Sequence, residues 1–246
     1  MRLLVSVRSG GEVGAAIEGG AEIIDAKEPT RGSLGAVDAA ALALIAKAVP
    51  DGMSLSIALG DHATPDAAAR AMDLLRAVVH RPGQLYVKIG LAGVVEPSTA
   101  RSVLRAAVGA ARSSALGPGV VAVAYADHRL AETIAPQLVL DAAAEAGAFG
   151  VLMDTWSKDG RPIFAWATRS DLGQWLEEAR NRGLLSALAG SLALDDMDVV
   201  CALDPDVVGV RGAACEHGRA GVVSARLVRQ LSAALHRAKP PLQTIS

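Results

Sequence analysis

Short apolar runs recur along the chain at intervals of roughly 30 residues, and each is followed by a longer segment with a helical period of apolar positions. The eight apolar runs cover 3–7, 21–27, 54–59, 85–91, 120–127, 150–155, 184–190 and 206–214. The helical patterns cover 10–21, 36–49, 65–80, 97–112, 134–147, 170–183, 194–203 and 224–238. Buried strands that alternate with helices pair in parallel through right-handed crossovers.

Eight strand–helix units are the number that closes a TIM barrel, an α/β fold of about 250 residues. A doubly wound open sheet is the alternative, but no GxGxxG motif follows the first strand as it does in dinucleotide-binding folds of that type. We therefore predict a single (β/α)8 barrel over residues 1–238. The last segment, "KPPLQTIS" at 239–246, lacks periodicity and is predicted to be a flexible tail.

The second apolar run, "AEIIDAK", carries two charges near its carboxyl end. Side chains alternate between the two faces of a strand, so Ile24 and Ala26 share one face while Asp25 and Lys27 share the other. The helices around the barrel pack against the apolar face of each strand. Asp25 and Lys27 are therefore predicted to point into the barrel.

The same alternation places ionisable groups inside the barrel on three more strands. Lys88 lies inward on the fourth strand, Tyr125 and Asp127 on the fifth, and Asp154 on the sixth. All lie near the carboxyl ends of their strands, where TIM barrels form their active sites. A self-satisfied ion-pair cluster closing the barrel is the structural alternative. We favour a functional site, because unpaired buried charge costs several kcal/mol.

Two inward lysines suggest covalent chemistry on a carbonyl. A lysine amine has a reference pKa of about 10.4, and a second ammonium about 5 Å away lowers it by roughly two units at an effective dielectric of about 20. Lys27 and Lys88 are expected to lie near enough for this coupling. A neutral lysine forms an imine with a carbonyl and acidifies the adjacent carbon, and nearby aspartates can transfer protons.

The last two strands end in "ALAGS" and "GVRGAAC", whose small residues leave backbone N–H groups accessible. TIM barrels often bind phosphate at the loops after strands 7 and 8. These glycines could instead only permit tight turns. The substrate- and phosphate-binding residues that we predict are Gly190, Ser191, Arg211, Gly212 and Ala213, together with Tyr125 and Asp127 on the fifth strand.

Composition narrows the classes of function. The chain is 51% hydrophobic and 20% charged with a net charge of -2, and its basic residues are scattered, so we expect no nucleic-acid partner. No apolar run reaches 18 residues, so no membrane span is expected. Cys201 and Cys215 form no CxxC motif, and the chain has no signal-peptide pattern, which together predict a cytoplasmic protein. The chain has no HExxH motif and no cluster of histidines and cysteines, so the sequence predicts no metal site.

Several motifs together resemble one known family, that of (5-formylfuran-3-yl)methyl phosphate synthase. They are "IIDAKEPTRGSLGA", "VKIGL", "YAD", "MDTWSKDG", "LAGS" and "DVVGVRGAAC", and they run in the same order from the first strand to about residue 215. The residues after Lys27 ("EPTR") and before Lys158 ("TWS") depart from the family pattern, which affects loop details rather than the chemistry.

This resemblance implies a TIM-barrel lyase that condenses two molecules of glyceraldehyde 3-phosphate to a furan, the precursor of the C1 carrier methanofuran, with loss of phosphate and water. It implies that Lys27 forms the Schiff base and that Lys88 accepts a proton. Asp25, Asp154 and Lys158 would assist proton transfers and phosphate departure. No cofactor is expected, and the chain is expected to form a homo-oligomer.

Two other functions remain open at the level of the sequence. One is a Schiff-base aldolase acting on another sugar phosphate through the same lysine. The other is a non-catalytic barrel that binds a phosphorylated metabolite and regulates a partner. Product analysis separates the first from the furan synthase, and covalent trapping at Lys27 separates the second from both.

Overall fold

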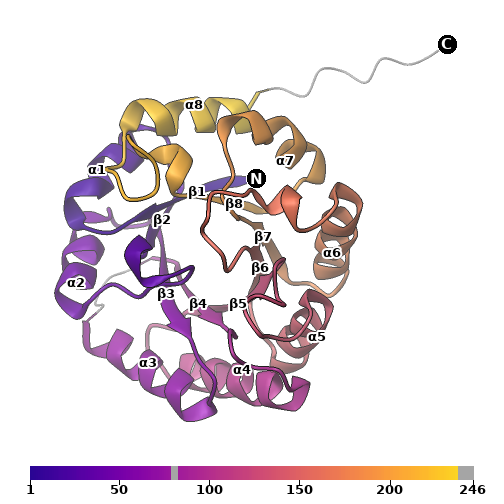
Figure 1. Ribbon diagram of the computed structural model, residues 1–246. Helices are drawn as coiled ribbons and strands as arrows, with labels where there is room; N and C mark the ends of the chain where they lie inside the picture. Colours follow the sequence, from indigo (N-terminus) through magenta and orange to yellow (C-terminus); the bar gives the residue numbers. More distant parts are fainter. Residues whose placement is uncertain (79–82, 238–246) are drawn as a thin grey trace.

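The strands form a closed barrel in a computed structural model that describes residues 1–78 and 83–237 (Figure 1). Each strand pairs in parallel with the next in sequence, and the last pairs with the first. The strands are β1 (Arg2–Val7), β2 (Ile23–Ala26), β3 (Ser54–Asp61), β4 (Leu85–Gly90), β5 (Gly119–Tyr125), β6 (Gly150–Asp154), β7 (Leu185–Leu188) and β8 (Val207–Val210).

The helices form a ring around the barrel (Figure 1). They are α1 (Gly10–Glu18), α2 (Ala39–Ala48), α3 (Pro65–Val78), α4 (Pro97–Arg112), α5 (Pro136–Ala146), α6 (Arg169–Asn181), α7 (Met197–Leu203) and α8 (Ala225–Leu235). Short 3-10 turns lie in four of the loops, at η1 (Pro29–Arg31), η2 (Ile163–Ala165), η3 (Leu194–Asp196) and η4 (Gly212–Ala214). Within the described ranges, no helix is long and apolar enough to cross a membrane.

The predicted (β/α)8 barrel is confirmed, with every strand and helix at its expected place in the chain. Most strands are shorter than their apolar runs, and β2 ends at Ala26, so Lys27 is the first residue after it. The predicted tail at 239–246 lies outside the described residues, and the domain boundary at residue 238 stays a prediction.

Alternation along the strands divides the core into two layers. Outward residues such as Ile24, Ile57 and Val87 pack against the helices in the larger apolar cluster. Inward residues such as Ile23 and Tyr86 form a separate, smaller cluster inside the barrel. The predicted parity of the strands is therefore confirmed, because the two faces bury different sets of side chains.

The loop between β2 and α2 (residues 27–38, the β2–α2 loop) folds into one side of the barrel opening. Ser33 and Leu34 are buried within it, and Leu34 joins the interior cluster beside Tyr125 and Ala131. The loop closes on itself through the bond from the Glu28 N–H to the Gly35 carbonyl, at 2.8 Å. It thereby packs against the interior of the barrel beside the end of β5.

We predict that replacing Leu34 destabilises the protein as a core substitution does, although it lies in a loop. Leu34 is 1% exposed, so Leu34→Ala should lower the free energy of unfolding by about 2–5 kcal/mol through lost burial and a residual cavity. Urea denaturation measures the change. Leu44→Ala is the control, because that leucine is 62% exposed on α2; equal effects of the two substitutions would contradict the buried position of Leu34.

Candidate active site

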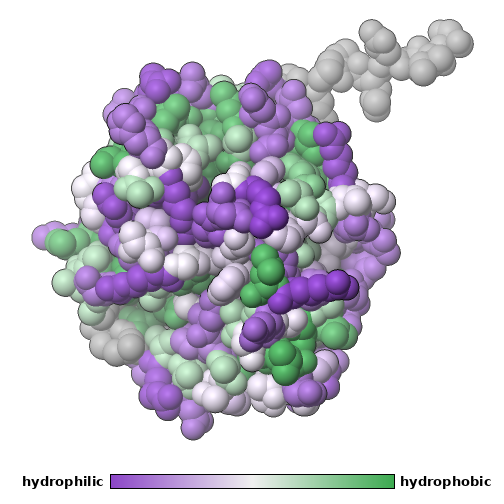
Figure 2. Space-filling view, in the orientation of Figure 1, coloured by the Kyte–Doolittle hydropathy of each residue, from purple (hydrophilic) through white to green (hydrophobic). Residues whose placement is uncertain are grey.

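A cavity of about 340 Å³ opens among the carboxyl ends of the strands and extends into the barrel. Apolar side chains such as Leu4, Ile23 and Leu152 line its inner part. Hydrophilic side chains gather near the centre of the corresponding face of the molecule (Figure 2). The charged residues among its lining are Lys27, Lys88, Asp154, Lys158, Arg211 and Arg219.

Lys27 lies at the carboxyl end of β2, where its backbone N–H extends the sheet by donating to the Val7 carbonyl at 3.0 Å. Its side chain is only 7% exposed and, within the described residues, forms no ion pair. Burial, and next the nearby Lys88 ammonium, lower the pKa of Lys27 from 10.5 to about 7, against the opposing effect of Asp154 and Asp25.

Lys88, on β4, pairs with Asp25, on β2. The Lys88 Nζ lies 2.7 Å from Asp25 Oδ1, and the Ser6 hydroxyl donates to Asp25 Oδ2 at 2.7 Å. Burial alone would raise the pKa of Asp25, but the charges of Lys88 and Lys27 outweigh it and keep that pKa below its usual value. Asp25 shares a face with Lys27 as expected, yet its ion-pair partner is Lys88.

Lys158, in the loop after β6, pairs with Asp154 at the end of that strand. The two atoms Lys158 Nζ and Asp154 Oδ1 are 2.7 Å apart, and the Thr155 N–H also donates to that oxygen at 2.8 Å. The second oxygen accepts from the Ser33 hydroxyl at 3.2 Å. Burial would raise the pKa of Asp154, but Lys158 and Lys27 hold it well below its usual range. Asp154 is therefore a fixed anion that orients Lys158.

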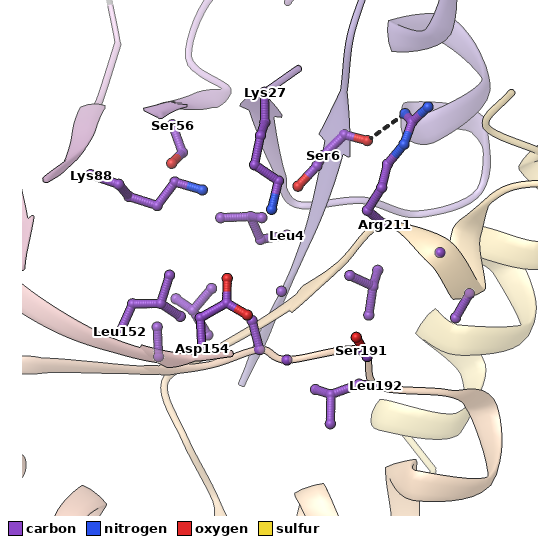
Figure 3. A pocket seen from close by; sticks show the side chains of 18 of the residues that line it. Leu4, Ser6, Lys27, Ser56, Lys88, Leu152, Asp154, Ser191, Leu192 and Arg211 are labelled. Atoms are coloured by element: carbon purple, nitrogen blue, oxygen red, sulfur yellow. Dashed lines mark hydrogen bonds between the residues drawn. The ribbon is translucent and has the colours of Figure 1, made fainter. Parts of the chain in front are cut away.

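Figure 3 shows the side chains of Lys27 and Lys88 extending into one shared space, with the Asp154 carboxylate facing them. The predicted convergence of the two lysines is therefore present. The leading cause of the low Lys27 pKa is burial, however, and repulsion by Lys88 comes second. Three ammonium groups face two carboxylates, and the cluster is neutral only when Lys27 has lost its proton.

The loops after β7 and β8 contribute the predicted backbone groups. Gly190, Ser191, Gly212 and Ala213 all line the cavity. Gly190 and Ser191 have positive φ values of 106° and 53°, and for serine this is an uncommon, strained conformation of the kind found at functional sites. In the described part of the chain, the N–H groups of these four residues donate to no carbonyl, so they can bind an anion.

Arg211 lines the cavity, but its guanidinium already has a carboxylate partner. Its guanidinium binds Glu12 through two bonds, at 2.6 and 3.1 Å, and donates to the Ser6 carbonyl at 3.0 Å (Figure 3). It also donates to the Gly221 carbonyl at 2.7 Å. This bidentate buried pair joins α1 to the loop after β8. The structure does not place Arg211 as the free phosphate counter-charge that its position in the sequence suggests.

Tyr125 lies in the interior cluster as predicted and Asp127 lies in the turn after β5, but neither lines the cavity. The Tyr125 hydroxyl donates to Asp61 Oδ1 at 2.7 Å, on the side filled by the β2–α2 loop. Asp127 accepts from the N–H groups of Trp156 and Ser157, at 2.7 and 2.8 Å, and so fixes the loop that carries Lys158. Their positions indicate support of the site rather than contact with substrate.

Sequence reasoning missed several residues of this site, among them Ser33, Glu12 and Arg219. Ser33 and Glu12 are partners of Asp154 and Arg211, and each depends on a contact between segments far apart in the chain. Arg219 lines the cavity from the loop after β8. The only signal for Arg219 was a basic residue in the glycine-rich segment "CEHGRAG" after the last strand.

Comparison with known proteins identifies relatives across nearly the whole chain. The sequence profile of 4-HFC-P synthase matches residues 3–232. The (5-formylfuran-3-yl)methyl phosphate synthase of Methanopyrus kandleri is 40% identical over 237 residues, which cover 95% of this chain and 98% of that protein. The enzyme of the same name from Archaeoglobus fulgidus is 35% identical and is covered completely, over 96% of this chain.

The chain belongs to the 4-HFC-P synthase family. The resemblance stated from the motifs is thereby confirmed. Members of this family are named as synthases, and the present chain is accordingly an enzyme. The lysine and aspartate cluster described above contains an amine of the kind that can react with a carbonyl.

More distant solved structures share the fold. Phosphoribosyl anthranilate isomerase from Thermus thermophilus superposes with a TM-score of 0.61 at 18% identity, covering 96% of this chain and 98% of that one. 3-Hexulose-6-phosphate synthase from Salmonella typhimurium gives a TM-score of 0.60 at 20% identity, covering 96% of this chain and all of the other. At this identity, the similarity establishes the barrel alone.

We predict that removing the Lys27 amine stabilises the protein near neutral pH. The folded-state pKa of about 7 lies below the unfolded value, so the unfolded chain binds more protons between about pH 7 and pH 10.5, and the stability of the wild type rises with pH across this window. Lys27→Met should therefore raise the free energy of unfolding by about 2–4 kcal/mol at pH 7, with a gain that shrinks toward pH 10.5.

Urea denaturation at several pH values measures this gain. Lys47→Met, which removes an exposed lysine on α2, is the control for loss of one lysine. A Lys27→Met variant that is less stable than the wild type at pH 7 would show that burial of the Lys27 amine does not destabilise the folded protein.

Proposed function

We propose that this protein condenses two molecules of glyceraldehyde 3-phosphate to (5-formylfuran-3-yl)methyl phosphate through a Schiff base at Lys27, in the biosynthesis of a methanofuran-type C1 carrier. The observation that carries the proposal is a buried amine with a pKa of about 7 that opens onto a cavity at the carboxyl ends of the strands. The names of the curated relatives supply the product.

The proposed conversion balances without an oxidant or a reductant. Two triose phosphates together contain the atoms of the furan phosphate plus one phosphate and two molecules of water. The enzyme must therefore form one carbon–carbon bond, close one ring and expel three leaving groups. Imine formation and proton transfer supply each of these steps.

Lys27 begins the reaction as the nucleophile. With a pKa of about 7, roughly half of its amine is neutral at neutral pH, whereas an amine titrating at 10.5 is neutral in about one molecule in three thousand. Attack on the substrate carbonyl gives a carbinolamine. Loss of water then gives the protonated imine, which withdraws electrons from the adjacent carbon and makes its proton acidic.

Lys88 is placed to move that proton. Its Nζ lies 2.7 Å from Asp25 Oδ1, and an ammonium must donate a proton before it can accept one. We assign its proton to the hydroxyl that leaves the carbinolamine as water. The resulting neutral Lys88 then accepts the proton of the carbon next to the imine, and Asp25 keeps the amine oriented throughout.

Lys158 is placed to assist the departing phosphate. Its ammonium lines the cavity and is fixed by Asp154 and by the Thr155 hydroxyl, at 2.7 and 3.1 Å. A fixed ammonium stabilises the negative charge that develops as a phosphate leaves. The free N–H groups of the loops after β7 and β8 are suited to bind a phosphate of the substrate.

We predict that Lys27 is modified covalently by substrate. Sodium borohydride added in the presence of glyceraldehyde 3-phosphate should reduce the imine to a stable amine, which peptide mass spectrometry then locates at Lys27. Lys27→Arg should abolish both the adduct and the formation of furan, which is measured by its ultraviolet absorbance together with released phosphate. Furan formation by Lys27→Arg would contradict the proposal, and an aldol adduct formed without phosphate release would favour the aldolase alternative.

We predict that two substitutions of Lys88 distinguish the effect of its charge on the pKa of Lys27 from its role in proton transfer. Both Lys88→Met and Lys88→Arg should lower kcat by about a hundredfold or more, because neither side chain can cycle a proton at neutral pH. Lys88→Met should also move the acid limb of borohydride trapping to higher pH, because the Lys88 ammonium lowers the pKa of Lys27. Lys88→Arg should leave that limb near its wild-type position, and equal limbs in both variants would contradict the electrostatic role.

A further inference from the structure

Arg219 differs from three other cations of the cavity in having no carboxylate partner within ion-pair distance among the described residues. Lys88, Lys158 and Arg211 each lie 2.6 to 2.7 Å from a carboxylate. Arg219 lines the same cavity, but across residues 1–78 and 83–237 it forms no ion pair. The carboxylates of Asp154 and Glu28 act on Arg219 only from beyond ion-pair distance, so a bound anion would be its first direct anionic partner.

The partners of Arg219 are backbone carbonyls of the β2–α2 loop. Its Nη2 donates to the Gly32 carbonyl at 2.7 Å and to the Pro29 carbonyl at 3.1 Å, and its Nε contacts the Pro29 carbonyl at 3.3 Å. These bonds fix one edge of the planar group. The Nη1 donors have no acceptor in the described part of the chain, so one edge of a rigid, charged fork is available.

In the part of the chain that the structure describes, the direct ion pairs around the cavity leave one permanent positive group without a paired carboxylate. The cations are Lys27, Lys88, Lys158, Arg211 and Arg219, and the carboxylates that pair with them are Asp25, Asp154 and Glu12. Lys27 can lose its proton and remove one of the two excess charges. Arginine remains protonated in proteins, so the other excess charge stays on Arg219.

Arg219 also lies beside the backbone groups that can bind an anion. A side chain added at Gly212 would contact the backbone nitrogen and Cα of Arg219, at 3.7 and 3.9 Å, so the two residues are neighbours. Gly212 is one of the four cavity-lining residues whose N–H groups donate to no carbonyl in the described residues. A permanent cation and free N–H donors on one wall are the elements of a phosphate site.

Building on the proposed function, we propose that Arg219 is the permanent counter-charge of a substrate phosphate, and that it makes the enzyme select phosphorylated aldehydes over neutral ones. The loop carbonyls hold the guanidinium in place before substrate arrives. Arg219 binds the phosphate without giving up a proton. It acts on recognition, while Lys27 acts on the carbonyl.

Borohydride trapping at Lys27 with two aldehydes tests this selectivity. Arg219→Gln should slow trapping with low concentrations of glyceraldehyde 3-phosphate by about tenfold to a hundredfold, which is the range for loss of a charge-assisted contact. Trapping with glyceraldehyde, which has no phosphate, should stay within about twofold of the wild-type rate. Arg226→Gln is the matched control, because Arg226 is exposed and pairs with Glu216 at 3.2 Å, and it should leave both rates unchanged.

A role of Arg219 limited to joining the two loops predicts a different result. Arg219→Gln would then slow trapping with both aldehydes equally, and this outcome would overturn the proposal. Arg219→Lys keeps the charge and loses the fork, so it should retain part of the preference for the phosphorylated aldehyde. A loss of that preference equal to the loss in Arg219→Gln would also contradict a charge-based role.

Binding of glycerol 3-phosphate separates this proposal from the proposed reaction. This ester has a phosphate but no carbonyl, so it cannot form an imine, and calorimetry measures its affinity directly. The wild type and Lys27→Met should both bind it, and Arg219→Gln should bind it about tenfold or more weakly. Equal binding by Arg219→Gln and the wild type, or no binding by the wild type, would overturn the assignment whether or not a furan is formed.

Discussion

The site depends on the burial of more ammonium groups than carboxylates inside one closed ring of strands. Asp25 is taken by Lys88 and Asp154 by Lys158, each at 2.7 Å, and Lys27 is left without a counter-ion among the described residues. Bulk water compensates for this only in part, because Lys27 is only 7% exposed. The least costly response is loss of a proton, and the protein thereby obtains a neutral amine near pH 7.

The scaffold supports this arrangement by holding every other charge in place. Ser6 and Ser33 bind the second oxygens of the two aspartates, and Asp127 fixes the loop that carries Lys158. The β2–α2 loop places Leu34 in the interior cluster, beside the cavity that holds the lysines. The strands and loops around Lys27 thus fix the charges and apolar side chains that surround its buried amine.

The sequence was sufficient for the barrel and for the side chains that its strands direct inward. Alternation within "AEIIDAK" and "LYVKIG" placed Lys27 and Lys88 inside, because one face of each strand had to meet the helices. It could not give the ion-pair partners. Asp25 binds Lys88 rather than its strand neighbour Lys27, and that choice depends on the register of β2, β3 and β4 around the ring.

Loops account for the remaining differences between prediction and structure. Arg211 was expected to face a phosphate, but Glu12 on α1 binds it, a contact that joins residues 199 positions apart. Arg219 carries no periodic pattern that would mark it, and only the folded chain shows it against the cavity. Strand periodicity defines which way a side chain points, whereas loop residues are placed by tertiary contacts.

The titration of the Lys27 amine tests the central claim most directly. Two-dimensional NMR of protein labelled with 13C at the lysine Cε follows each amine through its own chemical shift, and Lys27→Met identifies the signal of Lys27. The buried, unpaired environment predicts a midpoint near pH 7 in the absence of substrate. A midpoint near 10.5, the ordinary value for lysine, would contradict it and would remove the basis for an amine that reacts with carbonyls at neutral pH.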